Sequence, residues 1–164
     1  MQSTDHGQCQ WTLAVQTRAY RAGDLSGGGA AKNPGRWNEP GQAVVYCART
    51  IAIAVLETAA HINDAGLPLN KYLVRIEIPD ATWDARQELN VGALPATWAA
   101  IPAGGTSAGI GSEWIKSLRT AILLVPSVIV PEECAALINP AHADAAKLKA
   151  TVVRRFEYNK LFRA

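Results

Sequence analysis

The sequence predicts a single α+β domain, and two observations support this prediction. The chain has 164 residues, 49% of them hydrophobic and 18% charged, which suits one globular domain with a core of its own. Segments with the two-residue alternation of β-strands are mixed with segments of helical periodicity, without the regular β-α-β order of a doubly wound sheet. We therefore expect one compact domain over residues 1–164, with mixed sheets and flanking helices.

The first half of the chain contains the predicted strands 11–20 and 43–48. Between them, residues 21–33 carry four glycines and are expected to form a long flexible loop. Thr50 follows the second strand and is a suitable N-cap for a helix that continues to about residue 62. Apolar side chains at helical spacing support this helix.

The second half also mixes strands with helices. Residues 71–79 alternate between apolar and charged side chains, which indicates a half-buried strand. Asn139 and Pro140 resemble the N-cap and first residue of a helix that runs to residue 150. The remaining predictions are a short helix at 95–100, a Gly/Pro/Ser-rich loop at 101–111, a helix at 112–118 and strands at 121–125 and 152–158.

Charge and residue usage exclude several functional classes. The net charge of +2 provides no strong field for binding nucleic acid or membranes. Residues 1–10 hold no secretory signal, and no apolar run is long enough to span a membrane. The cysteines Cys9, Cys47 and Cys134 form no C-x-x-C pair and share no metal-ligand spacing with the histidines. We expect a cytoplasmic protein without a structural metal.

Two polar residues lie within apolar segments where a core is expected. Glu57 follows Val55 and Leu56 on the predicted helix, and its spacing to His61 also fits an exposed Glu–His pair. Tyr46 lies in the middle of a predicted strand, where it is either a core aromatic residue or part of a site. Periodicity by itself leaves both choices open.

Arg36 and Ser127 also each allow a structural and a functional interpretation. Arg36 follows a glycine-rich segment, where it either binds a phosphate through two hydrogen bonds or stacks on Trp37 at the surface. Ser127 follows Pro126 at the end of an apolar strand, where it either caps a turn or presents its hydroxyl at a cleft. A cation, an aromatic ring, a carboxylate and a hydroxyl in one pocket would suit cleavage of an N-glycosidic bond in a nucleotide.

At these residues the sequence resembles the RES domain, the toxin half of the bacterial RES–Xre toxin–antitoxin pairs. The resemblance covers about residues 18–161. The matching blocks are Tyr20-Arg21, Gly35-Arg36-Trp37-Asn38 with Gly41 and Val44-Val45-Tyr46, Ala54-Val55-Leu56-Glu57 with His61, Gly111-Ser112-Glu113-Trp114, Leu124-Val125-Pro126-Ser127, Ile138-Asn139-Pro140-Ala141-His142 and Phe156 to Leu161.

The resemblance implies an NAD-cleaving enzyme with a fold similar to that of diphtheria-toxin-like ADP-ribosyltransferases. NAD is then the substrate, and no further cofactor and no metal are required. The implied catalytic residues are Arg36, Tyr46, Glu57 and Ser127, and the implied NAD-binding residues are Arg21, Arg36, Asn38, Tyr46, Ser127 and Asn139.

The same resemblance suggests a role for each main residue. Glu57 would stabilise the cationic sugar, and Tyr46 would stack on the nicotinamide ring. Arg36, with Arg21 as a second clamp, would hold the pyrophosphate. Ser127 would position the nicotinamide-side ribose or the phosphate.

The implied partner is a cognate Xre-type antitoxin that blocks the active site, and a homodimer within that complex is left open. Trp83 and Trp98 belong either to an antitoxin or dimer surface or to the core. Three functions compete: a toxin that degrades free NAD by hydrolysis or phosphorolysis, a transferase that modifies one protein with ADP-ribose, and a nucleotide-binding module without catalysis. Val55 stands two residues before Glu57, where arginine-modifying transferases often carry a second carboxylate. We favour the toxin that degrades free NAD.

Overall fold

The computed structural model describes residues 10–16, 22–60 and 71–158, and the structural statements below concern these residues. Its elements are β1 (Gln10–Gln16), α1 (Gly28–Lys32), β2 (Val45–Ala48), α2 (Ile51–Ala59), β3 (Lys71–Ile78), α3 (Asp80–Asp84), β4 (Gln87–Glu88), η1 (Val91–Ala93), η2 (Ala96–Ala99), α4 (Gly105–Ser117), β5 (Ile122–Pro126), β6 (Cys134–Ile138), η3 (Ala143–Lys147) and β7 (Lys149–Phe156). None of the helices in the described segments is long and apolar enough to cross a membrane.

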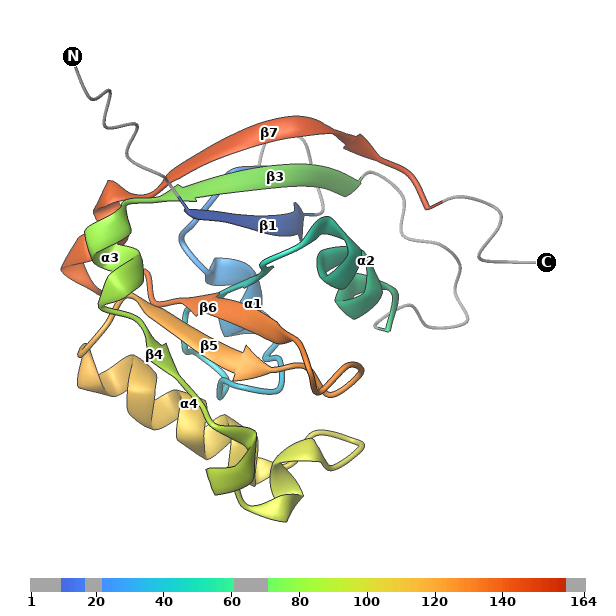
Figure 1. Cartoon of the computed structure of the whole chain (residues 1–164), viewed down its shortest axis with the longest axis vertical. Helices are drawn as coiled ribbons and strands as arrows, with labels where there is room; N and C mark the ends of the chain where they lie inside the picture. The colour runs from blue at the N-terminus through green and yellow to red at the C-terminus, as the bar shows by residue number, and fades with distance from the viewer. Residues whose placement is uncertain (1–9, 17–21, 61–70, 159–164) are drawn as a thin grey trace, which may run out of the picture.

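The strands form a seven-stranded sheet in the order β4-β5-β6-β2-β1-β3-β7. Its two halves meet where β1 and β2 pair at a single position, Leu13 opposite Ala48. Figure 1 shows β1, β3 and β7 above and β4, β5 and β6 below, so the sheet folds back on itself. Only the short pair β4–β5 is parallel, and the other pairs are antiparallel. The predicted α+β class is confirmed.

The main core fills the space between the two halves of the sheet. The alternation predicted for residues 71–79 is confirmed, because Val74, Ile76 and Ile78 of β3 are completely buried there. They pack with residues of β2, β5 and β6, among them Val45 and Ile122. Burying one such side chain stabilises the fold by roughly 1.5–3 kcal/mol.

A second core covers the other face of the β2-β6-β5 half. There Trp37, Trp98 and Trp114 pack against Leu123, Val125 and Leu137. Trp98 is 6% exposed, and Trp83 is 6% exposed in the first core, so both tryptophans belong to the interior rather than to a docking surface. Figure 1 shows α4 below this half of the sheet.

Two glycine-rich segments contain helices where loops were expected. Within 21–33, Gly27 adopts φ 69° and precedes the short helix α1. A Cβ at Gly27 would lie 2.5 Å from the backbone nitrogen of Val44, so only glycine fits at this position without a steric clash. Helix α4 begins at Gly105, although 101–111 was predicted as a loop, because its packing on the sheet outweighs the low helix propensity of glycine.

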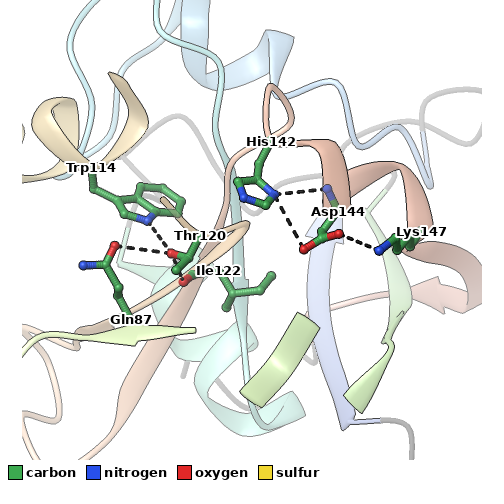
Figure 2. A network of polar contacts seen from close by, with 7 residues as sticks. All are labelled: Gln87, Trp114, Thr120, Ile122, His142, Asp144 and Lys147. Atoms are coloured by element: carbon green, nitrogen blue, oxygen red, sulfur yellow. Dashed lines mark hydrogen bonds and ion pairs between the residues drawn. The ribbon is translucent and has the colours of Figure 1, made fainter. Parts of the chain in front are cut away.

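The helix predicted over 139–150 is wrong. The structure instead has the short helix η3, whose N-cap is His142: its Nδ1 accepts a hydrogen bond from the backbone N–H of Asp144. Figure 2 shows this cap beside the ion pair between Lys147 and Asp144, 2.6 Å long. The strand β7 then begins at Lys149, three residues earlier than predicted, and strand β6 was not predicted from the sequence. Strand β6 has only five residues, and it forms by pairing with β2 on one side and β5 on the other. A segment this short has too little pattern of its own to be predicted as a strand.

Other predictions on the elements are confirmed. Thr50 is the N-cap of α2, and its Oγ1 accepts from the N–H of Ile53 at 3.2 Å. Cys47 is buried, whereas Cys134 is partly exposed. The predicted ends of the first strand, at 17–20, and of the helix, at 61–62, lie outside the described residues.

Candidate active site

Glu57 and Ser127 are joined directly. The Ser127 hydroxyl donates a 2.6 Å hydrogen bond to Oε1 of Glu57. The Oγ atom of Ser127 also accepts hydrogen bonds from the N–H groups of Ile129 and Val130, each at 3.1 Å. Ser127 is 2% exposed, and its hydroxyl is fully used by these three bonds. It therefore both caps the turn after β5 and orients the carboxylate.

The position of Glu57 follows from the packing of α2. Ile53 and Ala54 on this helix are buried against Ala48 of β2, with Val130 packed beside them. Glu57 lies one turn further along the same helix face, and this brings its carboxylate to the end of β5. The Tyr158 hydroxyl donates to the carbonyl of Val55 at 3.3 Å and fastens the C-terminal segment to the same helix.

Arg36 is held by backbone carbonyls. Its Nη1 donates to the carbonyl oxygens of Trp98 and Ala100, both at 2.9 Å. Trp37, the next residue, stacks on Trp98 with 6.0 Å between the ring centroids. Arg36 is half-buried, and one nitrogen of its guanidinium, Nη1, is thus hydrogen-bonded within the protein. Its Nη2 and Nε form the edge that remains for a bound anion.

Tyr46 and Asn38 hold the segment around Arg36. The Tyr46 hydroxyl donates to Oδ1 of Asn38 at 2.8 Å and accepts from the backbone N–H of Trp37 at 3.0 Å. Asn38 Oδ1 also accepts from the N–H of Gly35 at 2.8 Å. Asn38 is 2% exposed, so its side chain is a buried structural group in this structure.

Burial raises the pKa of Tyr46 to about 12, while the hydrogen bond from Trp37 and the charge of Arg36 act in the opposite direction. The phenol is therefore neutral at physiological pH. A neutral phenol keeps its proton and donates it in a hydrogen bond, so Tyr46 is not suited to act as a general base.

Strands β6 and β5 connect the position of Tyr46 with that of Ser127. Tyr46 lies beside Leu137 of β6, which in turn pairs with Leu123 of β5, and all three belong to the second core. Ser127 is four residues beyond Leu123, and its N–H continues the ladder by donating to Glu133 at 2.9 Å. Ser127 therefore lies one residue beyond the end of β5, about 13 Å along the strand direction from Leu123.

Asn139 lies at the opposite end of this strand pair. Pro126 pairs with Cys134, so Asn139 is five residues, or about 16 Å, away along β6. Its Nδ2 donates to the carbonyl of Ile115, and its Oδ1 accepts from the N–H of Ala141. The structure therefore does not bring Asn139 together with Glu57 and Ser127, and its amide ties α4 to the end of β6.

The remaining predictions lie outside the described residues. These are Arg21, the proposed second clamp, and His61, the partner in the exposed-pair interpretation of Glu57. Conversely, sequence reasoning missed the backbone groups that surround the site, namely the carbonyls of Trp98 and Ala100 and the amides of Ile129 and Val130. A backbone group carries no sequence signal, since every residue except proline offers the same pair.

Comparison with known proteins defines the class of this chain. A family model described as RES domain matches residues 10–159, and the chain therefore belongs to the RES domain family. A Sphingobium protein called Prs ADP-ribosylating toxin is 54% identical over 149 residues, covering 91% of this chain and 92% of that protein. A Yersinia enterocolitica protein called Toxin Res is 39% identical over 128 residues, covering 78% and 82%.

A solved structure supports the fold. A chain in the crystal structure of the MbcT–MbcA toxin–antitoxin complex of M. tuberculosis matches with a TM-score of 0.63. The match covers 90% of this chain and 86% of that chain at 16% sequence identity. The resemblance to the RES family, stated from short motifs, is confirmed.

Proposed function

We propose that this chain is the toxin of a bacterial toxin–antitoxin pair and that it consumes NAD by cleaving the bond between nicotinamide and ribose. The observation that carries this proposal is the Glu57 carboxylate fixed by the buried Ser127 hydroxyl. Membership of the RES family and the relatives named as toxins support it. Loss of NAD would arrest growth, and the antitoxin would prevent that loss.

The chemistry needs little from the protein beyond charge and position. The C1′–N bond breaks, its electron pair leaves with nicotinamide, and the ribose develops positive charge. Glu57 accepts a hydrogen bond from a ribose hydroxyl and stabilises that charge. Water or phosphate then attacks C1′, which gives ADP-ribose plus a proton or a phosphorylated ADP-ribose. The leaving pyridinium is already cationic, so the proposal includes no metal and no cofactor.

The other groups bind and orient the substrate in this proposal. The free edge of Arg36 holds the pyrophosphate, because Nη1 is occupied by the two carbonyls. The half-buried Tyr46 ring offers a stacking face for nicotinamide. Ser127 acts through Glu57, because its hydroxyl has no capacity left for the ribose.

A second candidate is transfer of ADP-ribose to a protein. The relative with 54% identity is named as an ADP-ribosylating toxin that acts on Prs, which favours this alternative. The nucleophile at C1′ is then a side chain of the acceptor protein instead of water or phosphate. Val55 leaves this chain without a carboxylate two residues before Glu57, so an arginine acceptor is not favoured.

The proposed partner is a cognate antitoxin of the Xre type that covers the site. The complex is cytoplasmic in this proposal, and it contains either one toxin chain or a toxin homodimer. Co-purification of the toxin with the product of a neighbouring gene tests this part. Size-exclusion chromatography with light scattering then gives the stoichiometry.

The deciding experiment incubates purified protein with NAD, with and without phosphate and with and without cell lysate. Nicotinamide with ADP-ribose indicates hydrolysis, and phosphorylated ADP-ribose indicates phosphorolysis. Labelled protein bands indicate transfer. Intact NAD under every condition would contradict catalysis and leave a nucleotide-binding module.

A further inference from the structure

We propose that Asn38 and the hydroxyl of Tyr46 are positioning residues that lock the main chain on both sides of Arg36 and so preorganise its guanidinium for the substrate. This inference rests on the proposed function, and it assigns the Tyr46 hydroxyl a task separate from stacking by the Tyr46 ring. It also gives Asn38 a role other than substrate contact.

The Asn38 carboxamide is the centre of this lock. Oδ1 accepts from the N–H of Gly35 and from the Tyr46 hydroxyl, both at 2.8 Å. Nδ2 donates to the carbonyls of Ala30 at 3.0 Å, Glu39 at 3.2 Å and Gln42 at 3.1 Å. One buried amide thus joins α1, the segment before Arg36 and the turn after it.

Tyr46 closes the lock from the other side. Its hydroxyl accepts from the N–H of Trp37, so the residues immediately before and after Arg36 are both tied to the Tyr46–Asn38 pair. A Cβ at Gly35 would lie 2.7 Å from Cζ of Tyr46, so the backbone rests directly on the ring. The direction in which Arg36 leaves the main chain is therefore fixed.

The far end of Arg36 is fixed as well. Nη1 is held by the carbonyls of Trp98 and Ala100, and the stacked rings of Trp37 and Trp98 brace the same two segments. With both ends held, the free edge of the guanidinium has one orientation before the substrate arrives. Preorganisation of this kind increases affinity by reducing the ordering that binding requires.

The test measures NAD affinity by calorimetry in proteins that carry Glu57→Gln, so that NAD is not consumed. Tyr46→Phe removes the hydroxyl and keeps the ring. The change removes both hydrogen bonds of the hydroxyl and loosens the segment around Arg36, so we expect it to raise the NAD dissociation constant by about fivefold. If the ring acts by stacking alone, Tyr46→Phe leaves the affinity unchanged, and that result overturns the proposal. The matched control is Tyr72→Phe, because Tyr72 is also half-buried but lies on β3. This variant should leave the NAD dissociation constant unchanged.

A double-mutant cycle shows whether Tyr46 acts through Arg36. In an Arg36→Ala background, Tyr46→Phe should change the affinity by less than about twofold, because the group it positions is gone. A full fivefold effect in that background overturns the inference. Asn38→Ala removes the acceptor that Gly35 and Tyr46 share, so it should weaken NAD binding at least as much as Tyr46→Phe.

Hydrogen exchange separates this inference from the proposed function. If the wild-type protein neither binds nor consumes NAD, the proposed function fails. The lock is still tested, because Tyr46→Phe should accelerate exchange of the Trp37 amide about fivefold while the amides of α2 keep their rates. Unchanged exchange at Trp37 overturns the lock even if the enzyme consumes NAD.

Discussion

Ser127 and Glu57, seventy residues apart in the sequence, are joined by a 2.6 Å hydrogen bond from the serine hydroxyl to the carboxylate. The serine is held in turn by the amides of Ile129 and Val130. A carboxylate that is fixed before the substrate binds needs no reorganisation when positive charge develops beside it. This pair makes the chemistry of the site testable by small substitutions.

Glu57→Gln should lower the kcat for NAD consumption at least about 100-fold while NAD still binds. Glutamine keeps the shape and still accepts from Ser127, but it lacks the charge that stabilises the cationic ribose. Nicotinamide release measured by chromatography gives kcat. The exposed Glu132→Gln is the matched control, and near-normal turnover in Glu57→Gln would show that Glu57 has been misassigned.

Ser127→Ala should reduce both stability and turnover. The change leaves the N–H groups of Ile129 and Val130 without their acceptor, at a cost of about 1–3 kcal/mol in the free energy of unfolding. Urea denaturation measures this cost. Kinetics of the single and double variants with Glu57→Gln should show strong non-additivity, since Ser127 acts through Glu57. Additive losses would argue that the two residues work independently.

Arg36→Ala should weaken NAD binding about tenfold or more, because a charge-assisted pair with a phosphate is lost. Arg36→Lys retains the charge but cannot hold two carbonyls and a phosphate together, so an intermediate affinity is expected. The exposed Arg119→Ala serves as the control for net charge. Unchanged NAD affinity in Arg36→Ala would exclude the phosphate clamp.

Gly111→Ala should destabilise the protein by about 2 kcal/mol or more. A Cβ at Gly111 would lie 1.8 Å from the carbonyl oxygen of Trp37, so α4 must move away from the segment that carries Arg36. Gly109, in the same helix, has no atom within 4 Å of its Cβ position. Gly109→Ala should therefore be neutral or stabilising by about 0.5–1 kcal/mol in urea denaturation. Equal behaviour of the two variants would contradict this packing.

The pKa of Tyr46, raised to about 12 by burial, predicts a loss of stability in alkali. Below pH 10 the phenol is protonated in both states, and its contribution is complete. Between pH 10 and 12 the unfolded chain loses this proton and the folded protein keeps it. The free energy of unfolding therefore falls by up to about 1.4 kcal/mol per pH unit. Denaturation across this range should show a shallower fall for Tyr46→Phe, and parallel curves would refute the shift.

The sequence predicts those parts of the fold that local patterns specify. The Thr50 cap, the helix that follows it and the alternation of residues 71–78 depend on near neighbours, and the structure has them as predicted. The motifs of the RES family also identify the candidate catalytic residues, which are Arg36, Tyr46, Glu57 and Ser127.

Local rules fail at glycines that lie in helices or immediately before them. The segments that contain Gly27 and Gly111 resemble loops, but both glycines are required by close backbone contacts with distant residues. The end of the helix predicted over 139–150 failed for a related reason, since Lys149 and Ala150 belong to β7, which pairs with β3. Neither a close approach nor a strand partner is visible in a local window of sequence.

The sequence by itself determined the family, the α+β class and the polar residue types at the site. Only the tertiary structure decided which of them touch. It joined Ser127 to Glu57 and Tyr46 to Asn38, and it placed Asn139 at the far end of the β5–β6 pair. The physical reason is that hydrogen-bond partners depend on distances in space, which are set by strand register and core packing across the whole chain.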